Sequence, residues 1–222
     1  MRTRILLIRH AESEKNLMDI HGGKGMPLTE NGRRQAYKLA QRLSSYGVDN
    51  TNSYIFSPDS VQTQETAEII QQYLNVQQIH LRGFKTLDMG IVKGLSNLEI
   101  RTRFPDVYER LKKWRNKKSD ISELCIEQME SPEIFYLRGK KVLEEIQDGK
   151  FNIFVLTTSL YILLTHILLG DTVEKGGGYV HINVNNGEQT CFIRDDNGYR
   201  VCADETDVED ILEIAQKKEL VY

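Results

Sequence analysis

The amino-acid sequence predicts an α/β protein, a three-layer sandwich whose mainly parallel central sheet is flanked by helices, with a helical insertion. Short apolar, β-branched segments alternate with segments of helical period along most of the chain, which is the pattern of strands connected through helices. At 222 residues the chain has the length of one domain with an insertion and can bury a sizeable core. We therefore expect a single domain over residues 1–222, with the insertion at about residues 96–147.

The first half of the chain predicts two strands, each followed by a helix. Residues 4–9 and residues 53–57 are apolar runs of strand length. Thr29 is a suitable N-cap for the first helix, which should end near Gly47, because a threonine hydroxyl can accept a hydrogen bond from a free N–H of the first turn. The second helix is expected over residues 60 to about 73. The inward face of the first helix consists of Ala36, Leu39, Ala40 and Leu43.

The second half begins with the charge-rich residues 96–147, which are mostly of helical pattern and are expected to lie over one edge of the core. A third strand over residues 151–157 leads into an apolar helix over residues 160–169 that stops at Gly170. Two turn signals, Asn185-Asn186-Gly187 and Asn197-Gly198, predict hairpins. These would join strands at about residues 179–184, 190–194 and 199–202, ahead of a helix with Val208, Ile211, Leu212 and Ala215 at helical spacing.

The three cysteines, Cys125, Cys191 and Cys202, are an odd number without a C-x-x-C pair. This pattern argues against a disulfide framework and against a zinc site, and it favours buried free thiols. If Asn197-Gly198 is a two-residue hairpin loop, Ile193 rather than Cys191 lies opposite Cys202.

The composition argues against two classes of partner. The formal net charge is −3, so no overall field favours nucleic acid or an anionic membrane. The basic clusters at residues 112–113 and 117–118 have acids nearby and no interleaved aromatic residues, and we interpret them as solvated helix faces. No apolar run has the length that spans a bilayer. Residues 1–5 run into a strand pattern rather than a signal peptide, so we expect a cytoplasmic protein.

Arg9 and His10 stand at the carboxyl end of the first predicted strand, the edge at which open α/β sheets bind their ligands. A histidine can attack phosphorus, and an adjacent arginine can hold two phosphate oxygens in its planar fork. An isolated Arg-His pair would more simply be a satisfied polar pair at a strand end. Here, further motifs accompany the pair.

The surrounding sequence resembles the histidine phosphatases, or phosphoglycerate-mutase-like proteins, whose hallmark after the first strand is Arg-His-Gly-Glu. Arg9-His10-Ala11-Glu12 is similar to it, and Ser13 and Asn16 also match. The further matching segments are Pro27-Leu28-Thr29-x-x-Gly32-x-x-Gln35-Ala36, Thr66-Ala67, Leu87-Asp88-Met89-Gly90, Gly94-Leu95, and Glu130-Ser131 with Arg138. The resemblance covers residue 4 to about residue 170. It implies the family's α/β fold, a phosphorylated His10 held by Arg9, and no requirement for a metal or cofactor.

Three positions differ from the family pattern. In the family, a second arginine and a second histidine hold the phosphoryl group, and an acid protonates the leaving oxygen. The resemblance places Gln62, Thr158 and Thr86 at these positions, in that order. All three side chains are neutral. We therefore expect the site to retain anion binding although its catalysis is impaired. The expected site therefore consists of the catalytic pair Arg9 and His10 with the ligand contacts Asn16, Gln62, Thr86, Thr158 and Glu12.

Two residues are candidates to compensate for these losses. His21 lies in a glycine-rich loop that could reach the mouth of the pocket. Asp88 is two residues from Thr86 and could act as a displaced acid, although the family commonly has an aspartate there as well. The remaining histidines, His80, His166 and His181, are interpreted as structural.

The leading hypothesis is a degenerate histidine phosphatase that binds a phosphorylated or otherwise anionic small molecule, or a partner protein, with little conventional turnover. A first alternative is an active phosphohydrolase or phosphotransferase with a phospho-His10 intermediate, or an enzyme with altered chemistry in the remodelled pocket. A second alternative is a structural subunit in which residues 96–147 supply a contact surface for a partner. The intact Arg9-His10 pair weighs against the second alternative. The sequence favours no particular oligomeric state.

Overall fold

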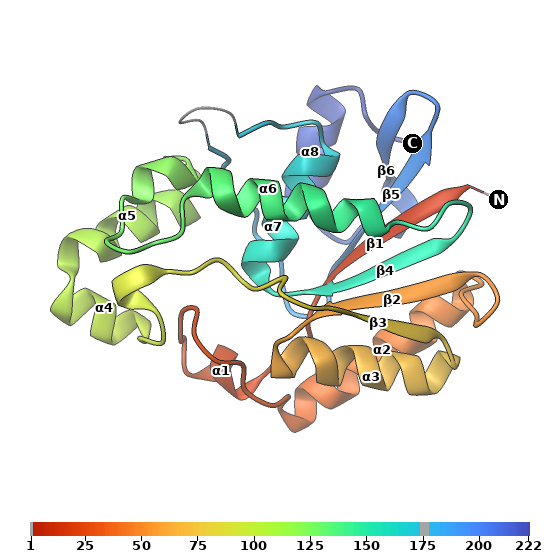
Figure 1. Cartoon of the computed structure of the whole chain (residues 1–222), viewed down its shortest axis with the longest axis horizontal. Helices are drawn as coiled ribbons and strands as arrows, with labels where there is room; N and C mark the ends of the chain where they lie inside the picture. Colours follow the sequence, from red (N-terminus) through yellow and green to blue (C-terminus); the bar gives the residue numbers. More distant parts are fainter. Residues whose placement is uncertain (1, 174–177) are drawn as a thin grey trace.

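The centre of the protein is a mixed sheet (Figure 1). Its strands are β1 (Thr3–Arg9), β2 (Ser53–Pro58), β3 (Gln77–Leu81), β4 (Phe151–Leu156), β5 (Gln189–Asp195) and β6 (Gly198–Cys202). The computed structural model describes residues 2–173 and 178–222, and within them the strands form one six-stranded sheet in the order β3-β2-β4-β1-β5-β6. The pairs from β3 to β1 are parallel, whereas the pairs that include β5 are antiparallel. The prediction of a mainly parallel sheet is confirmed.

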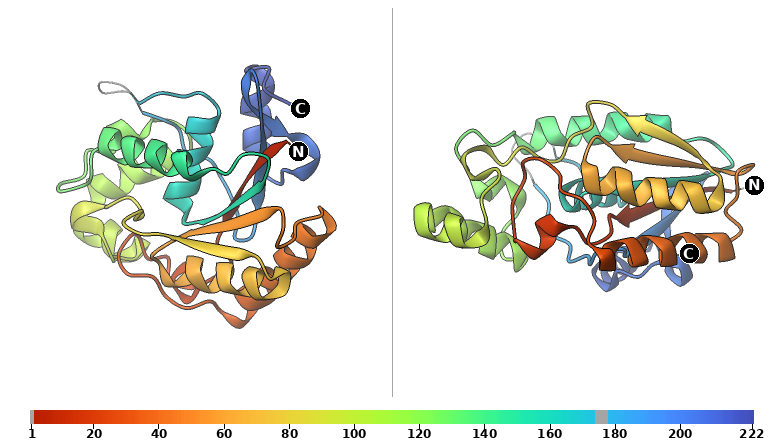
Figure 2. Two further views of the ribbon diagram at one scale, coloured as in Figure 1. Left: turned by 45° about the vertical axis from the view of Figure 1, so that its right-hand side comes forward. Right: turned by 90° about the horizontal axis from the view of Figure 1, so that it is seen from below.

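Helices cover both faces of this sheet (Figure 2). The α-helices are α1 (Glu14–Leu17), α2 (Glu30–Ser45), α3 (Val61–Leu74), α4 (Asn97–Arg103), α5 (Pro105–Arg115), α6 (Pro132–Val142), α7 (Thr158–Leu168) and α8 (Glu209–Lys217). Short 3-10 helices are η1 (Gly90–Val92), η2 (Ile121–Leu124), η3 (Leu143–Glu145) and η4 (Ala203–Glu205).

Strand β1 shows how the three layers are built. Leu6 and Ile8 pack in a cluster with residues of α2 and α3, whereas Ile5 and Leu7 pack in a second cluster with residues of α6, α7 and α8. Successive residues of a strand point to opposite faces of the sheet. A strand buried on both faces therefore reads as an uninterrupted apolar run, and the predicted three-layer arrangement is confirmed.

The predicted insertion, residues 96–147, is largely helical, but it has two different parts. Helices α4 and α5 lie beyond the carboxyl ends of the parallel strands (Figure 1). Helix α6 instead packs beside α7 over one face of the sheet. Gly139 allows this close packing, since a Cβ there would lie 2.7 Å from a methyl group of Leu163. Only the first part of the segment therefore extends beyond the three layers.

The start of α2 contacts the segment that follows His10. The Thr29 hydroxyl accepts a hydrogen bond from the Gly32 N–H at 2.9 Å, which confirms the predicted N-cap, and it donates to Glu12 Oε1 at 2.6 Å. Gly32 packs directly on this segment, because a Cβ there would lie 1.9 Å from the Glu12 carbonyl oxygen. The predicted inward residues of this helix are all buried: Ala36, Leu39, Ala40 and Leu43.

The prediction of a strand over residues 179–184 is wrong, because this segment has no regular secondary structure in its described part. The chain after it wraps around the end of β1 and does not pair in a hairpin. Arg9 N–H donates to the Glu188 carbonyl and Gly187 N–H donates to the Arg9 carbonyl, each at 3.0 Å. The Arg9 side chain donates to the Val184 carbonyl at 2.7 Å. These contacts use the peptide groups that a hairpin at Asn185-Asn186-Gly187 would need.

Two elements have no counterpart in the sequence prediction. Strand β3 lies at the edge of the sheet and buries only Leu81, so it lacks the apolar run that reveals a strand. Helix α1 has four residues and none of them is buried, so it shows no amphipathic period.

The hairpin of β5 and β6 has a different register from the predicted one. Asp195 pairs with Gly198, and Cys191 lies opposite Cys202. The two-residue loop is therefore Asp196-Asn197, and Gly198 begins the next strand with φ of 115°. Ile193 consequently pairs with Arg200. Cys191 and Cys202 are buried free thiols, as predicted, whereas Cys125 is exposed.

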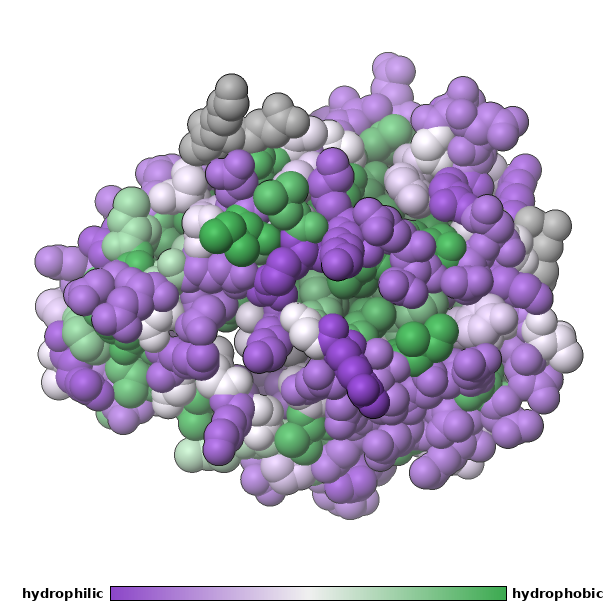
Figure 3. Space-filling model, in the orientation of Figure 1, coloured by the Kyte–Doolittle hydropathy of each residue, from purple (hydrophilic) through white to green (hydrophobic). Residues whose placement is uncertain are grey.

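The outer surface in the view of Figure 3 is mostly hydrophilic, with separate apolar patches. Within residues 2–173 and 178–222, no helix combines the length and the apolar character that a membrane crossing requires.

We expect Gly32→Ala to lower the free energy of unfolding by about 1–3 kcal/mol, because the new methyl group would overlap the backbone of Glu12 and force α2 away from it. This loss outweighs the roughly 1 kcal/mol by which alanine is the better helix former. Urea unfolding measures it. Asn31→Ala is the control, since Asn31 is exposed in the same turn and should change stability little. Equal stability of the two variants would contradict the close contact.

Candidate functional site

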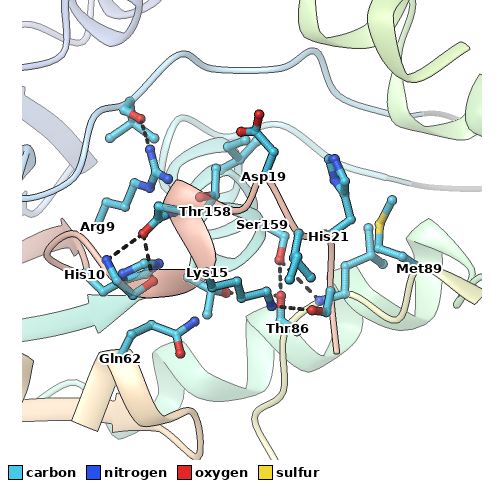
Figure 4. A pocket seen from close by; sticks show the side chains of 18 of the residues that line it. Arg9, His10, Lys15, Asp19, His21, Gln62, Thr86, Met89, Thr158 and Ser159 are labelled. Atoms are coloured by element: carbon cyan, nitrogen blue, oxygen red, sulfur yellow. Dashed lines mark hydrogen bonds between the residues drawn. The ribbon is translucent and has the colours of Figure 1, made fainter. Parts of the chain in front are cut away.

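A cavity of about 430 Å³ opens at the carboxyl ends of β1 and β4 (Figure 4). It is lined from several elements that are far apart in the sequence: the end of β1, the start of α3, the loop after β3 and the start of α7. The structure brings six of the seven expected site residues to this one pocket: Arg9, His10, Asn16, Gln62, Thr86 and Thr158. The carboxyl ends of parallel strands meet at one edge of a sheet, which explains why residues from β1 and from the segments that follow β2, β3 and β4 converge here.

The guanidinium of Arg9 is the most buried cation of the pocket. Its Nη1 donates to the Val184 carbonyl at 2.7 Å, and its Nε is buried with no hydrogen-bond partner among the described residues. Burial lowers the pKa of Arg9 to about 10, against the opposing field of Glu188. The group therefore stays charged at neutral pH.

The imidazole of His10 is held neutral. Only 3% of His10 is exposed, and its Nδ1 lies 2.7 Å from the Ala11 carbonyl oxygen. Because a carbonyl only accepts, Nδ1 carries the proton and Nε2 carries the lone pair. Burial, and then the charge of Arg9, lower the pKa of His10 to about 3. His10 is thus an unprotonated nitrogen base beside a fixed cation, which is the state that a nucleophile requires.

Glu12 is the expected site residue that the structure does not bring into the pocket, because it is absent from the lining. Its carboxylate accepts the hydrogen bond from Thr29 at the start of α2, and its N–H donates to Gln35 Oε1 at 2.9 Å. Glu12 therefore anchors the loop that carries His10. The prediction that Glu12 contacts the ligand is not supported by this placement.

Asn16 lines the pocket with its amide fixed. Its Oδ1 accepts from the Ser13 N–H at 2.9 Å and from the Ser13 hydroxyl at 2.8 Å. Asn186 Nδ2 donates to the same oxygen at 3.3 Å and to the His10 carbonyl at 2.8 Å. With its oxygen occupied, Asn16 presents its amide N–H groups as the donors for a ligand.

The three positions that differ from the family pattern carry neutral groups in the structure. Gln62 is 4% exposed, and its Oε1 is buried with no partner among the described residues. The hydroxyl of Thr86 is 2.7 Å from that of Ser159. Thr158 is the first residue of α7. These side chains offer hydrogen bonds to a ligand but no charge and no strong acid.

The structure places two further cations in the pocket lining, Lys15 and Arg115. Lys15 Nζ donates to the Gly22 carbonyl, and Arg115 donates to Asn97 Oδ1 at 3.0 Å. In the sequence, Lys15 lies between Ser13 and Asn16, which both match the family motif. This position could have indicated that Lys15 belongs to the pocket. Arg115 ends α5, next to the basic clusters that we interpreted as solvated. Only the position of α5 in the fold shows that Arg115 lines the pocket.

His21 lines the pocket, as its loop suggested. Its ring nitrogens face the guanidinium of Arg115, with Nε2 2.7 Å from Nη2. Burial and the charge of Arg115 lower the pKa of His21 to about 4. The ring is therefore neutral at physiological pH and does not replace the cationic second histidine.

Asp88 is absent from this pocket and lies in the lining of the neighbouring one. Lys93 Nζ donates to its carboxylate at 2.7 Å, and this hydrogen bond lowers the pKa of Asp88. A carboxylate held ionised is a poor general acid.

Asp19, which the sequence analysis did not single out, is the acidic side chain in the described lining of the main pocket.

His181 differs from its predicted role as a residue of a strand. It lines the pocket from the irregular segment and packs edge-on against Trp114, with ring centroids 4.7 Å apart. Burial and the charge of Arg115 lower its pKa to about 4. Of the other two histidines, His166 is buried and hydrogen-bonded to Asp171 and Val180, and His80 is exposed on β3.

Among the described residues, one group of side chains has the composition and spacing of a metal site: Cys191, Cys202 and Glu205. None of the three lines the pocket.

Comparisons with known proteins agree with this geometry. A model of the histidine phosphatase superfamily (branch 1) matches residues 5–201. The chain is 30% identical over 157 residues to phosphoserine phosphatase 1 of Hydrogenobacter thermophilus, a match that covers 70% of each protein. It is 39% identical over 90 residues to a probable phosphoglycerate mutase of Cronobacter sakazakii. That second match spans 40% of this chain and 40% of the mutase, less than half of the mutase's length.

Solved structures show the same fold. The phosphoglycerate mutase of Bacillus anthracis superposes with a TM-score of 0.71 at 22% identity, over 98% of this chain and 97% of that one. A mycobacterial glucosyl-3-phosphoglycerate phosphatase superposes with a TM-score of 0.69 at 20% identity, over 94% of this chain and 98% of that one. These likenesses establish the α/β architecture around the pocket.

The burial of neutral His10 predicts a pH dependence of stability. Its pKa of about 3 in the folded protein lies below the ordinary value of 6.5. Its contribution to the free energy of unfolding is therefore complete above pH 6.5, and it is lost as the pH falls towards 3, because the unfolded chain is protonated first. Between pH 6.5 and 5 this loss is about 2 kcal/mol for one histidine. We expect the free energy of unfolding, measured in urea, to fall by about 2 kcal/mol less in His10→Gln than in the wild type between pH 6.5 and 5. His80→Gln, altered at an exposed site, should behave as the wild type. Equal pH dependence of His10→Gln and wild type would contradict a buried, neutral His10.

Proposed function

Because the chain belongs to the histidine phosphatase superfamily, we propose that its pocket binds a phosphorylated or otherwise anionic small molecule at Arg9 and His10. Conventional phosphatase or mutase turnover is strongly impaired in this proposal. Its main support is the charged guanidinium of Arg9, which lines the pocket next to the neutral His10. Charge-assisted hydrogen bonds to phosphate oxygens are the strongest interactions that such a donor makes.

The charge of the described lining supports an anionic ligand. Three basic side chains, Arg9, Lys15 and Arg115, and one carboxylate, Asp19, lie in this lining. In Figure 4, Arg9 and His21, the latter hydrogen-bonded to Arg115, lie on opposite sides of the pocket. Cations at both ends of a cavity of about 430 Å³ favour a ligand with more than one anionic group. Arg9 would hold the phosphate in this arrangement, and Arg115 would hold the second group.

The neutral side chains around His10 account for the impaired turnover. Removing one preorganised donor from developing negative charge costs roughly 10²–10³ in rate. Losing the general acid costs roughly 10²–10⁴ when the leaving group needs a proton. Such losses are not additive within one site. Even so, Gln62, Thr86 and Thr158 together should place hydrolysis of alkyl phosphates orders of magnitude below that of a relative with the full set.

One observation favours the alternative of an active enzyme with altered chemistry. Asp19 brings a carboxyl group into the pocket from the loop after α1, where it adopts a positive φ of 51°. Asp19 is thus a candidate for the role that Thr86 does not fill. Asp19→Asn tests this: it should abolish turnover if Asp19 is the acid, and it should leave residual turnover unchanged in the leading proposal.

Anion binding is tested by titrating inorganic phosphate and vanadate into the protein in a calorimeter. We expect the wild type to bind both, and Arg9→Gln and Lys15→Gln to weaken binding by about 10-fold or more, since a hydrogen bond to a charged group is worth about 1.5–3 kcal/mol. Arg34→Gln removes the same kind of charge from a side chain that is 63% exposed on α2 and should bind as the wild type. Unchanged binding by Arg9→Gln would refute Arg9 as the anion contact.

Turnover is tested by comparing the wild type, His10→Ala, and the triple variant Gln62→Arg, Thr86→Glu and Thr158→His. Residual wild-type activity should favour aryl or acyl phosphates over alkyl phosphates, because an unprotonated leaving oxygen must depart as an anion. It should disappear in His10→Ala. The triple variant should gain about 10²-fold or more in phosphatase rate, in proportion to the restored donors and acid.

Two outcomes of this comparison contradict the proposal. Brisk hydrolysis of an alkyl phosphate by the wild type would show that turnover is not impaired. Residual activity that survives in His10→Ala would show that another group attacks the phosphorus.

A further inference from the structure

A cluster of three metal-ligating side chains lies away from the pocket, at the edge of the sheet formed by β5, β6 and η4. Cys191 lies in β5, Cys202 ends β6, and Glu205 ends the 3-10 helix that follows. Their sulfur and carboxylate oxygen atoms all lie within 4.8 Å of one another. We propose that this cluster binds a divalent, thiophilic cation of the zinc type, in a site separate from the anion pocket.

The spacing of the donor atoms is close to that of a zinc site. Zinc–sulfur bonds of about 2.3 Å and zinc–oxygen bonds of about 2.0–2.2 Å at tetrahedral angles place the ligand atoms roughly 3.5–3.8 Å apart. The observed limit of 4.8 Å exceeds this by about the movement that small side-chain rotations supply. Three protein ligands leave the fourth position for water.

Two elements of secondary structure bring the ligands together. In the register of the hairpin, Cys191 lies directly opposite Cys202, so the two side chains lie on the same face of the sheet. Residues three apart in a 3-10 helix lie on the same side of it, and η4 carries Glu205 three positions after Cys202 back over the pair. The predicted register, with Ile193 opposite Cys202, would have separated the two thiols.

Hydrogen bonds from Thr206 hold the backbone of both cysteines in place. Its hydroxyl accepts from the Cys191 N–H at 3.1 Å and donates to the Cys202 carbonyl at 2.7 Å. Gln189 Nε2 donates to the Glu205 carbonyl at 3.0 Å, which ties the 3-10 helix to β5. A site whose ligands are fixed before binding loses less conformational entropy when the ion arrives.

Glu205 faces the two thiols. Its side chain is 14% exposed, its Oε2 is buried without a nitrogen or oxygen donor among the described residues, and the thiol of Cys191 is hydrogen-bonded to this side chain. A thiol is a weak donor for a buried carboxylate, and a cation that replaces the thiol proton would satisfy it better.

The charges also balance around a divalent ion. Two thiolates and a carboxylate carry −3, a divalent cation reduces this to −1, and the guanidinium of Arg4 supplies the remaining positive charge. Arg4 Nη2 lies 3.6 Å from Glu205 Oε1. Arg4 is thus placed to neutralise the loaded site from outside the coordination sphere.

The test uses cobalt as a spectroscopic substitute for zinc, with the protein reduced and freed of metal by a chelator. One equivalent of Co²⁺ should produce the near-ultraviolet thiolate-to-cobalt absorption band, and Zn²⁺ should abolish it by displacement. Cys191→Ser and Cys202→Ser should each weaken binding by about 100-fold or more, and Glu205→Gln by about 10-fold or more. Cys125→Ser is the matched control, because that thiol is exposed and outside the cluster, and it should keep the full band.

Several results would overturn the proposal: no band in the wild type, a band that survives in both serine variants of the cluster, or a Cys191–Cys202 disulfide in the protein isolated without reductant. X-ray absorption of the zinc-loaded wild type needs no variant and should show two sulfur neighbours, whereas a shell without sulfur would refute the site. Phosphate titration of Cys202→Ser should equal that of the wild type, so failure of this proposal is distinguishable from failure of the proposed function.

Discussion

The guanidinium of Arg9 is a charge held largely out of water at the end of the central strand, and the chain around it is arranged to satisfy it. Burying an ion costs several kcal/mol unless hydrogen bonds and opposite charge compensate. The Val184 carbonyl accepts from Arg9, and the field of Glu188 opposes the loss of its proton. The segment between these two residues therefore wraps around the end of β1. The guanidinium keeps its charge and lines the pocket, which is the physical basis of the proposed anion site.

The same burial sets the state of His10. Removed from solvent and next to Arg9, the imidazole is neutral, and its proton is on Nδ1 facing the Ala11 carbonyl. Catalysis then depends on groups that stabilise charge as it develops, since an interaction that is equally strong in the ground state only improves binding. At the three changed positions around His10 those groups are amide and hydroxyl, whereas the charges of Arg9 and Lys15 act on His10 and Arg115 lies beside His21. In the proposed function, the cations hold the anion, and the neutral side chains at the changed positions leave the transfer of its phosphoryl group slow.

The edge of the sheet beyond β1 has a separate constraint. Strands β5 and β6 are the antiparallel part of the sheet, and their register is decided at the turn, where Gly198 follows Asp196-Asn197. That register puts two thiols opposite each other, and Thr206 fixes both backbones. None of these residues lines the pocket, so the proposed metal site is separate from the proposed anion site.

The sequence by itself determined the α/β class, the buried strand of β1, the capped and amphipathic α2, and the arrival of Arg9, His10, Gln62 and Thr158 at one edge of the sheet. These features follow from local patterns: apolar runs, an N-cap, helical period and motif order. Only the tertiary structure decided what depends on contacts between distant segments. Residues 179–184 have strand composition but are irregular, because their peptide groups bond to side chains and backbone of other segments, among them Trp114, His166 and Arg9. Arg115 reaches the pocket because α5 lies beyond the strand ends. Glu12 lies outside the pocket because its carboxylate is hydrogen-bonded to Thr29 at the start of α2. The two thiols lie opposite each other because the hairpin turns one residue earlier than the Asn-Gly signal predicts.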